Sequence, residues 1–143
     1  MKLKVITIGE PKLSFAREGF FEYIKRLGAY HSVQVQHLKD GIKDKKILDV
    51  IDNTFCVVLD EGGKEFSSKG LSHFLDEKAM QGVSKICFVV GGPDGHSDII
   101  KKRADVLWAF GKMTLPHDLA MVVLAEALYR ASTIHVNHPY HRE

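Results

Sequence analysis

The sequence has only two cysteines, little net charge and no uninterrupted apolar run long enough to cross a membrane. Cys56 and Cys87 lie within the apolar segments FCVVL and KICFVV, so we expect buried free thiols rather than redox or metal-binding groups. Such thiols indicate a reducing cytosol. The apolar stretch 119–136 contains Glu126 and Arg130, which excludes a membrane span, and MKLKVITIGE lacks the features of a signal peptide. We therefore expect a soluble, cytoplasmic protein without a membrane partner.

The charge balance and several missing motifs exclude further classes of protein. Twenty Lys and Arg residues oppose 18 Asp and Glu residues, giving a net charge of +2. No broad basic surface is expected, so any nucleic-acid site must be local. The motifs G-x-G-x-x-G, G-x-x-x-x-G-K-[ST], G-x-S-x-G and H-E-x-x-H are absent. Their absence argues against a dinucleotide oxidoreductase, a P-loop NTPase and two classes of hydrolase.

The composition, with 45% hydrophobic and 27% charged residues in a chain of 143, fits one globular domain over residues 1–143. Short β-rich segments alternate with segments of helical periodicity. We expect strands over 2–8, 33–38, 55–59, 85–90 and 106–110, and helices over 14–27, 45–51, 67–81, 97–104 and 117–133. Ser14, and Ser67 or Ser68, are the expected N-caps. The alternation predicts an α/β fold with a mainly parallel sheet flanked by helices.

Three loops follow expected buried strands, after Leu59, Val90 and Phe110. Ligands of open α/β sheets bind outside the carboxyl ends of the strands, so these loops form the default site. Gly91 and Gly92 could let the backbone approach a ligand closely, or could simply form a tight turn.

The segment MTLPH joins the last expected strand to the last helix. Its residues 113–115 could offer backbone groups to an adenine edge, because Pro116 fixes the backbone at the first helical turn. His117 could contact a polar substrate or act as a base near neutral pH. A capping or solvated histidine is the alternative interpretation.

The last helix carries Glu126 and Arg130 at a spacing of i, i+4 on an otherwise apolar surface. They could form an ion pair worth about 0.3–0.5 kcal/mol, or Arg130 could hold a phosphate or a substrate oxygen at a cleft. A helix that is apolar on nearly every side must be buried on most of them, which indicates a subunit interface, most often of a twofold dimer.

The C-terminal segment NHPYHRE places histidines at 135, 138 and 141. No cysteine or carboxylate cluster accompanies them and Pro139 breaks the helix, so no metal site is expected. Tyr140 could stack on a base while His138, His141 and Arg142 contact phosphates or base edges. A disordered terminus is the alternative.

Taken together, VVLDEGGKEFSS, FVVGGPDG, FGKMTLPH, LAEALYRA and NHPYHRE resemble the bacterial ribosomal RNA large-subunit methyltransferase H family of the SPOUT superfamily. The resemblance runs over the whole chain. It implies a SPOUT domain with a deep C-terminal trefoil knot, which departs from the general avoidance of threaded chains. It also implies a homodimer that uses S-adenosylmethionine to methylate N3 of a pseudouridine in 23S rRNA, in the large subunit or the whole ribosome.

The resemblance assigns roles to individual residues. The implied cofactor-binding residues are Leu59, Gly91, Gly92, Phe110, Gly111, Lys112, Met113, Thr114 and Leu115. The implied RNA-facing residues are His117, Arg130, Tyr140 and His141, with the tail of one subunit completing the site of its partner. Among these, His117, Arg130 and His141 are the catalytic candidates: either histidine could accept the N3 proton, and Arg130 could orient the base or a phosphate.

One position departs from the family. A basic residue usually lies four positions after the motif histidine, whereas this chain has Met121, which implies that one RNA contact is missing. The alternative function is therefore a non-catalytic RNA- or ribosome-binding module that retains the fold. The intact glycine loop and MTLPH segment favour the enzyme.

Overall fold

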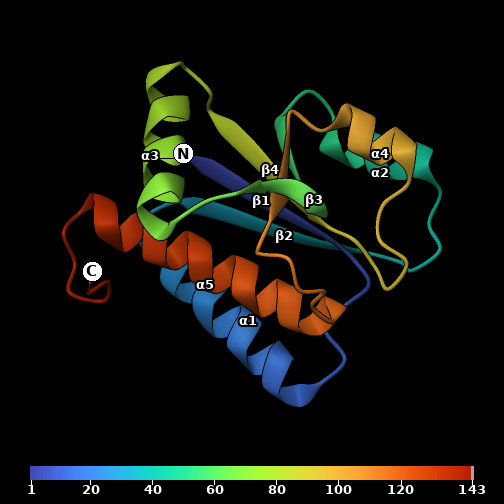
Figure 1. Ribbon diagram of the computed structural model, residues 1–143, viewed down its shortest axis with the longest axis horizontal. Helices are drawn as coiled ribbons and strands as arrows, with labels where there is room; N and C mark the ends of the chain where they lie inside the picture. The colour runs from blue at the N-terminus through green and yellow to red at the C-terminus, as the bar shows by residue number, and fades with distance from the viewer. Residues whose placement is uncertain (143) are drawn as a thin grey trace.

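The computed structural model describes residues 1–142, which form a five-stranded sheet with helices on both faces (Figure 1). The strands are β1 (Lys2–Ile8), β2 (Ser32–Leu38), β3 (Phe55–Glu65), β4 (Lys85–Val90) and β5 (Val106–Ala109). The helices are α1 (Ser14–Leu27), α2 (Asp44–Ile51), α3 (Ser68–Met80), α4 (Asp98–Arg103) and α5 (His117–His135). The strand order is β2-β1-β4-β3-β5 and every neighbouring pair is parallel. The predicted fold class is confirmed, while the knot stays a prediction.

Most expected boundaries shift by one or two residues, but two expectations fail. The third strand continues past Leu59 to Glu65, because after a register shift Lys64 pairs with Trp108 on β5. The prediction that Ser14 caps α1 is wrong. Leu13 is the N-cap residue and makes no side-chain cap, and the carboxylate of Asp118 instead accepts hydrogen bonds from the N–H groups of Lys12 and Leu13. The expected cap at Ser67 is confirmed, since its hydroxyl accepts from the Gly70 N–H.

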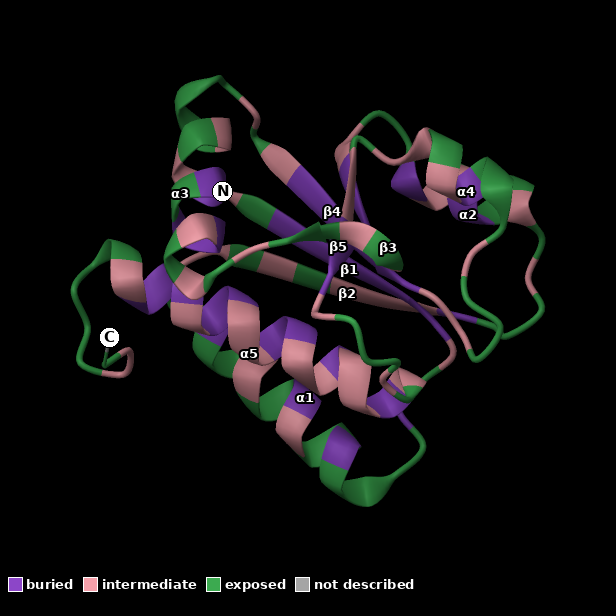
Figure 2. Ribbon diagram, viewed as in Figure 1, coloured by how far each residue is buried: buried purple, intermediate pink, exposed green. Residues whose placement is uncertain are grey.

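The two faces of the sheet carry separate cores because side chains alternate along each strand. Leu3 and Val5 of β1 belong to the core under α1, α3 and α5, whereas Ile6 and Ile8 belong to the core under α2 and α4. Figure 2 shows buried residues concentrated on the strands and on the sides of the helices that face them. The loops after β4 and β5 lie at the carboxyl edge of the sheet, where open α/β sheets bind ligands.

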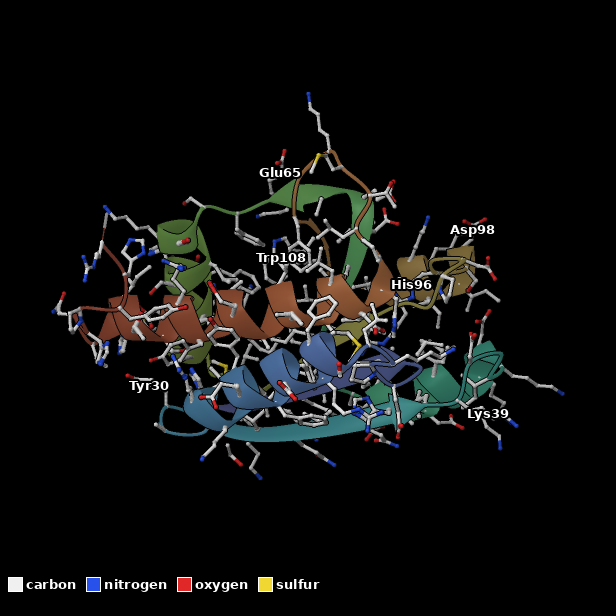
Figure 3. The ribbon with its side chains drawn as sticks, turned by 90° about the horizontal axis from the view of Figure 1, so that it is seen from below. Tyr30, Lys39, Glu65, His96, Asp98 and Trp108 are labelled. Carbon is white, nitrogen blue, oxygen red and sulfur yellow. The ribbon has the colours of Figure 1, made fainter. Side chains whose placement is uncertain are left out.

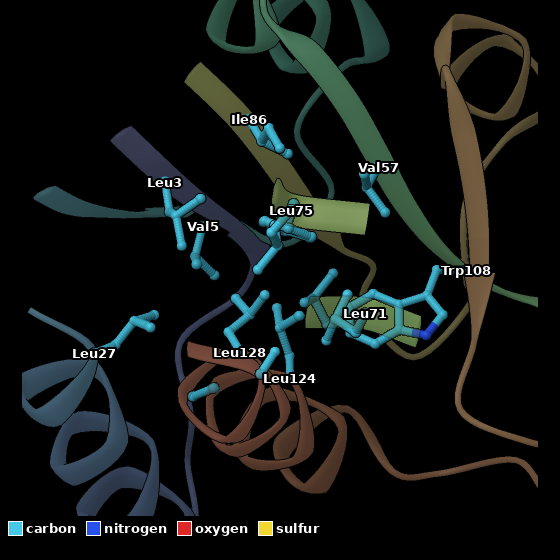
Figure 4. Packing of buried hydrophobic residues seen from close by; sticks show 14 of the residues in the cluster. Leu3, Val5, Leu27, Val57, Leu71, Leu75, Ile86, Trp108, Leu124 and Leu128 are labelled. Carbon is cyan, nitrogen blue, oxygen red and sulfur yellow. The ribbon is translucent and has the colours of Figure 1, made fainter. Parts of the chain in front are cut away.

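Helix α5 is apolar on most sides because it packs against several elements. Its residues Leu124 and Leu128 are fully buried in the core shared with the sheet, α1 and α3 (Figure 4). Leu71 and Leu75 of α3 fill the same core. None of the helices within residues 1–142 has the length and hydropathy of a membrane span. Cys56 and Cys87 are free and buried, as predicted.

Candidate active site

A cavity of about 1050 Å³ lies where the middle of β3 and the loops after β4 and β5 meet the start of α5. Small-molecule sites typically measure about 300–1,000 Å³, so the cavity is large enough for a cofactor. The residues of the predicted cofactor set that line it are Leu59, Gly91, Gly92, Phe110, Gly111, Met113, Thr114 and Leu115. Lys112 of the same set is exposed and is not among the lining residues. The structure thus brings together loops that are far apart in the sequence.

The two glycines of the β4 loop are in tight surroundings. A Cβ at Gly91 would lie 2.9 Å from His96 Nε2 and 3.0 Å from His96 Cε1, and a Cβ at Gly92 would lie 3.2 Å from Asp40 Oδ1. Any side chain at Gly91 would therefore displace the imidazole. Glycine is needed at Gly91 because the His96 ring lies so close to the backbone, whatever turn the loop forms.

His96 is a cavity residue that the sequence reasoning missed, although it directly follows GGPDG. Figure 3 shows it at the β4 loop, beside the start of α4. Burial lowers the pKa of His96, and the charge of Asp60 only partly opposes this effect. Its Nε2 atom is buried and has no hydrogen-bond partner within residues 1–142. The imidazole of His96 is therefore uncharged near physiological pH and lines one side of the cavity.

The charged side chains at the cavity are mainly acidic. Asp60 lies 3.2 Å from the ammonium of Lys101, which neutralises one carboxylate. Glu61 and Asp94 also line the cavity and are solvent-exposed. The excess of carboxylates favours a ligand that carries positive charge.

His117 lies at the start of α5 and closes one side of the cavity. Its side chain is 12% exposed, and its Nδ1 lies 3.3 Å from Oδ1 of Asp118. Its Nε2 is buried and has no hydrogen-bond partner in the described part of the chain. Asp118 contacts this histidine without lining the cavity, and the sequence reasoning missed it although it follows the motif histidine directly.

Arg130 lies toward the C-terminal end of α5, away from His117, in a cluster with Glu126 and Tyr140. Its Nε donates to Glu126 at 2.9 Å, and this hydrogen bond is the main reason that the pKa of Arg130 is raised. Its guanidinium also lies 4.9 Å from the centre of the Tyr140 ring. The Tyr140 ring packs edge-on against Tyr129 at 4.7 Å, and its hydroxyl donates to the Tyr23 hydroxyl at 3.3 Å. Burial raises the pKa of Tyr140.

The remaining tail residues differ in their contacts and exposure. His135 pairs with Asp76 at 2.9 Å, and His138 Nδ1 accepts from the Tyr140 N–H at 3.1 Å. His141 is half-buried and Arg142 is exposed. Among residues 1–142 no group of His, Cys, Asp and Glu has the arrangement of a metal site.

The predicted catalytic residues do not meet within one chain. Thirteen positions of α5 separate His117 from Arg130, which is about 20 Å at 1.5 Å per residue. In Figure 1 the tail lies at the opposite end of α5 from the loops of the cavity.

Met121 is fully buried in the core between α5 and the sheet. This position therefore does not face solvent in the described chain, and the methionine contributes to packing. The expectation that its identity decides an RNA contact is not supported by this placement.

Comparisons with known proteins identify the family and agree with this fold. A family model described as "Predicted SPOUT methyltransferase" matches residues 1–141. The chain is 49% identical to the ribosomal RNA large subunit methyltransferase H of Deinococcus radiodurans, with 99% of each protein aligned. It is 38% identical to the protein of the same name from Streptococcus agalactiae, with 99% of this chain and 100% of the relative aligned. The chain belongs to the SPOUT methyltransferase family, which confirms the resemblance seen in its motifs.

Solved structures show the same fold at low identity. A probable methyltransferase from Bordetella pertussis superposes with a TM-score of 0.60 and 9% identity, covering 92% of this chain and 95% of the other. The SpoU methyltransferase AviRb from Streptomyces viridochromogenes, solved in complex with the cofactor AdoMet, superposes with a TM-score of 0.54 and 13% identity, covering 95% and 58% of the two chains. These likenesses establish the fold.

Proposed function

We propose that this protein transfers the methyl group of S-adenosylmethionine to N3 of a pseudouridine in 23S rRNA, within the large subunit or the assembled ribosome. The observation that carries the proposal is the cavity between the middle of β3 and the loops after β4 and β5, which gathers eight of the nine predicted cofactor residues. The names of the relatives from Deinococcus and Streptococcus support an rRNA substrate. Such a substrate would place the protein in the cytoplasm.

The residues of the cavity fit this cofactor. When bound, S-adenosylmethionine supplies an electrophilic methyl group on a positively charged sulfonium. Glu61 and Asp94 favour that charge, while Gly91 and Gly92 allow the backbone to come close to the ligand. The protein then has to align the target nitrogen and receive its proton. Positioning of this kind can lower a barrier by about 7–11 kcal/mol.

We infer further that the working enzyme is a homodimer in which the tail of one subunit completes the cavity of its partner. Arg130, which lies against Tyr140, is about 20 Å along α5 from His117, too far to act on the same base within a single chain. The half-buried residues Leu119, Val123 and Ile134 lie on one side of α5, where they could be covered by a second copy.

The first experiment is calorimetric titration with S-adenosylmethionine and S-adenosylhomocysteine, followed by a methyl-transfer assay on ribosomes. We expect one site per subunit and a methyl group on 23S rRNA. If neither compound binds, the proposal is wrong. If both bind but no RNA is methylated, the chain is a binding module that retains its cofactor pocket.

The role of Arg130 is tested by comparing two variants. Arg130→Ala should abolish transfer while cofactor binding stays nearly unchanged, because the arginine lies far from the cofactor loops of its own chain and faces the RNA in the proposed dimer. Glu126→Gln is the matched control, since it breaks the same ion pair but leaves the guanidinium available. Equal losses in the two variants would show that only the ion pair matters. Equal loss of cofactor binding and transfer in Arg130→Ala would also contradict the assignment.

The shared site is tested by mixing two inactive variants. Subunits of His117→Ala and Arg130→Ala are unfolded and refolded together at equal amounts. If the site is shared, half of the dimers are mixed and each has one intact site, so about one quarter of the wild-type rate should return. If each chain acts alone, no activity returns.

A further inference from the structure

Asp118 makes contacts with two parts of the molecule through its two carboxylate oxygens. Oδ2 accepts hydrogen bonds from the N–H groups of Lys12 and Leu13 at 2.8 and 2.7 Å, immediately before α1. Oδ1 lies 3.3 Å from Nδ1 of His117. The residue is 8% exposed, so water competes little for these contacts. The carboxylate is therefore fixed in position by the start of α1 and presents one oxygen to the imidazole.

This arrangement determines the tautomer of His117. An ionised carboxylate only accepts hydrogen bonds, so Nδ1 must carry the proton that lies between the two groups. Burial alone would raise the pKa of Asp118, but the hydrogen bonds from Leu13, Lys12 and His117 outweigh it and hold the pKa below its ordinary value. Asp118 is consequently ionised at neutral pH. In neutral His117 the remaining nitrogen, Nε2, is then an unprotonated acceptor.

His117 Nε2 shares one property with His96 Nε2, the other imidazole nitrogen described above at the cavity. It is buried and has no hydrogen-bond partner within residues 1–142. A buried acceptor without a partner is unfavourable, so a partner supplied by the substrate would be gained when the site is occupied. The backbone at Gly9 lies beside the same ring, since a Cβ there would lie 3.6 Å from His117 Cε1.

We propose that Asp118 is a positioning residue that holds His117 with its proton on Nδ1, so that Nε2 receives the N3 proton of the target base. The inference rests on the proposed methyl-transfer function. In this step the N3–H bond breaks and its proton bonds to Nε2, which gives an imidazolium. N3 uses the released electron pair to bond the methyl carbon, as the carbon–sulfur bond breaks with both electrons remaining on sulfur. The negative charge of Asp118 balances the imidazolium, as in other carboxylate–histidine pairs.

The key variant is Asp118→Asn, which preserves the shape of the side chain. Its amide oxygen can still accept from Lys12 and Leu13, so α1 should remain anchored. Its NH₂ group would then face His117 Nδ1 and would favour the opposite tautomer, with the proton on Nε2. We expect kcat to fall by about 10²–10⁴-fold, the range typical of proton transfer by a side chain, while cofactor affinity and Tm stay close to wild type. Asp98→Asn is the matched control, because Asp98 is an exposed carboxylate in the first turn of α4.

The tautomer itself is measured by nitrogen-15 NMR of the histidine rings at mildly alkaline pH, with His117→Ala used to assign the signals. We expect the proton on Nδ1 in the wild type and in Asp98→Asn, and on Nε2 in Asp118→Asn. A wild-type proton on Nε2, or an unchanged tautomer and kcat in Asp118→Asn, would overturn the inference. If His117→Ala keeps its full kcat, the proton-acceptor role of His117 is wrong. If the wild-type protein methylates no RNA at all, the proposed function is rejected, and the tautomer measurement still tests the role of Asp118.

Discussion

Gly63 lies at the closest approach between two backbone segments, so its replacement by alanine should be costly. A Cβ built on Gly63 would lie 2.5 Å from the carbonyl carbon and oxygen of Leu107 and 2.6 Å from the nitrogen of Trp108. Ordinary contact begins at 3.4 Å, so the two segments would have to separate by roughly 0.9 Å. All three atoms belong to the backbone, and no side-chain rotation can relieve the overlap.

The magnitude follows from what that separation disrupts. After the register shift in β3, Lys64 pairs with Trp108 and Glu65 pairs with Ala109, and Trp108 is 3% exposed beneath this segment. Loss of about two hydrogen bonds at about 1 kcal/mol each, together with overpacking of about 1–3 kcal/mol, predicts a total loss of roughly 3–5 kcal/mol. For a chain of 143 residues, each kcal/mol lowers Tm by about 3 °C. Gly63→Ala should therefore lower Tm by roughly 9–15 °C.

The assay is thermal and urea unfolding of Gly63→Ala beside Gly62→Ala. The neighbouring glycine is a matched control, because a Cβ there would meet only a side-chain oxygen of Asp60, at 3.2 Å, which can move. Gly62→Ala should change the free energy of unfolding by less than about 1 kcal/mol. A similarly small loss in Gly63→Ala, or an equally large loss in both variants, would refute the reasoning.

Two further predictions concern the cavity and its histidines. Gly91→Ala should weaken S-adenosylmethionine binding in calorimetry because its Cβ overlaps the His96 ring, and the double variant Gly91→Ala/His96→Ala should regain part of the affinity. No recovery would show that the backbone, not the ring, is the obstacle. Burial lowers the pKa of His31, His37 and His96, so the unfolded chain binds protons more readily than the folded chain. The contribution of these histidines to the free energy of unfolding should therefore be fully present above about pH 6.5. It should decline as the pH falls through their lowered pKa values in the folded chain. Urea titrations between pH 8 and 5 test this, and His96→Gln should reduce the slope; a flat profile would contradict the burial argument.

The amino-acid sequence by itself determined the α/β fold and the segments that build the cavity. Continuous apolar runs such as 85–90 indicate buried parallel strands. The loops that follow parallel strands meet at one edge of the sheet. For this reason Leu59, Gly91 and Gly92 could be assigned to one site before their distances were known. The family motifs likewise have fixed local spacing and could be recognised directly.

Tertiary structure alone decided the contacts between elements that are distant in the chain. Asp118 binds the start of α1 across more than a hundred positions, which removes any need for Ser14 as a cap. Gly63 is required because β3 packs closely against the backbone of β5 at Leu107, within the register shift between the two strands, and no local pattern marks that contact. The distance between His117 and the tail depends on the unbroken length of α5, whose direction relative to the sheet is set by packing. Long-range geometry of this kind has no periodic signal in the sequence, whereas strand burial and helix periodicity do.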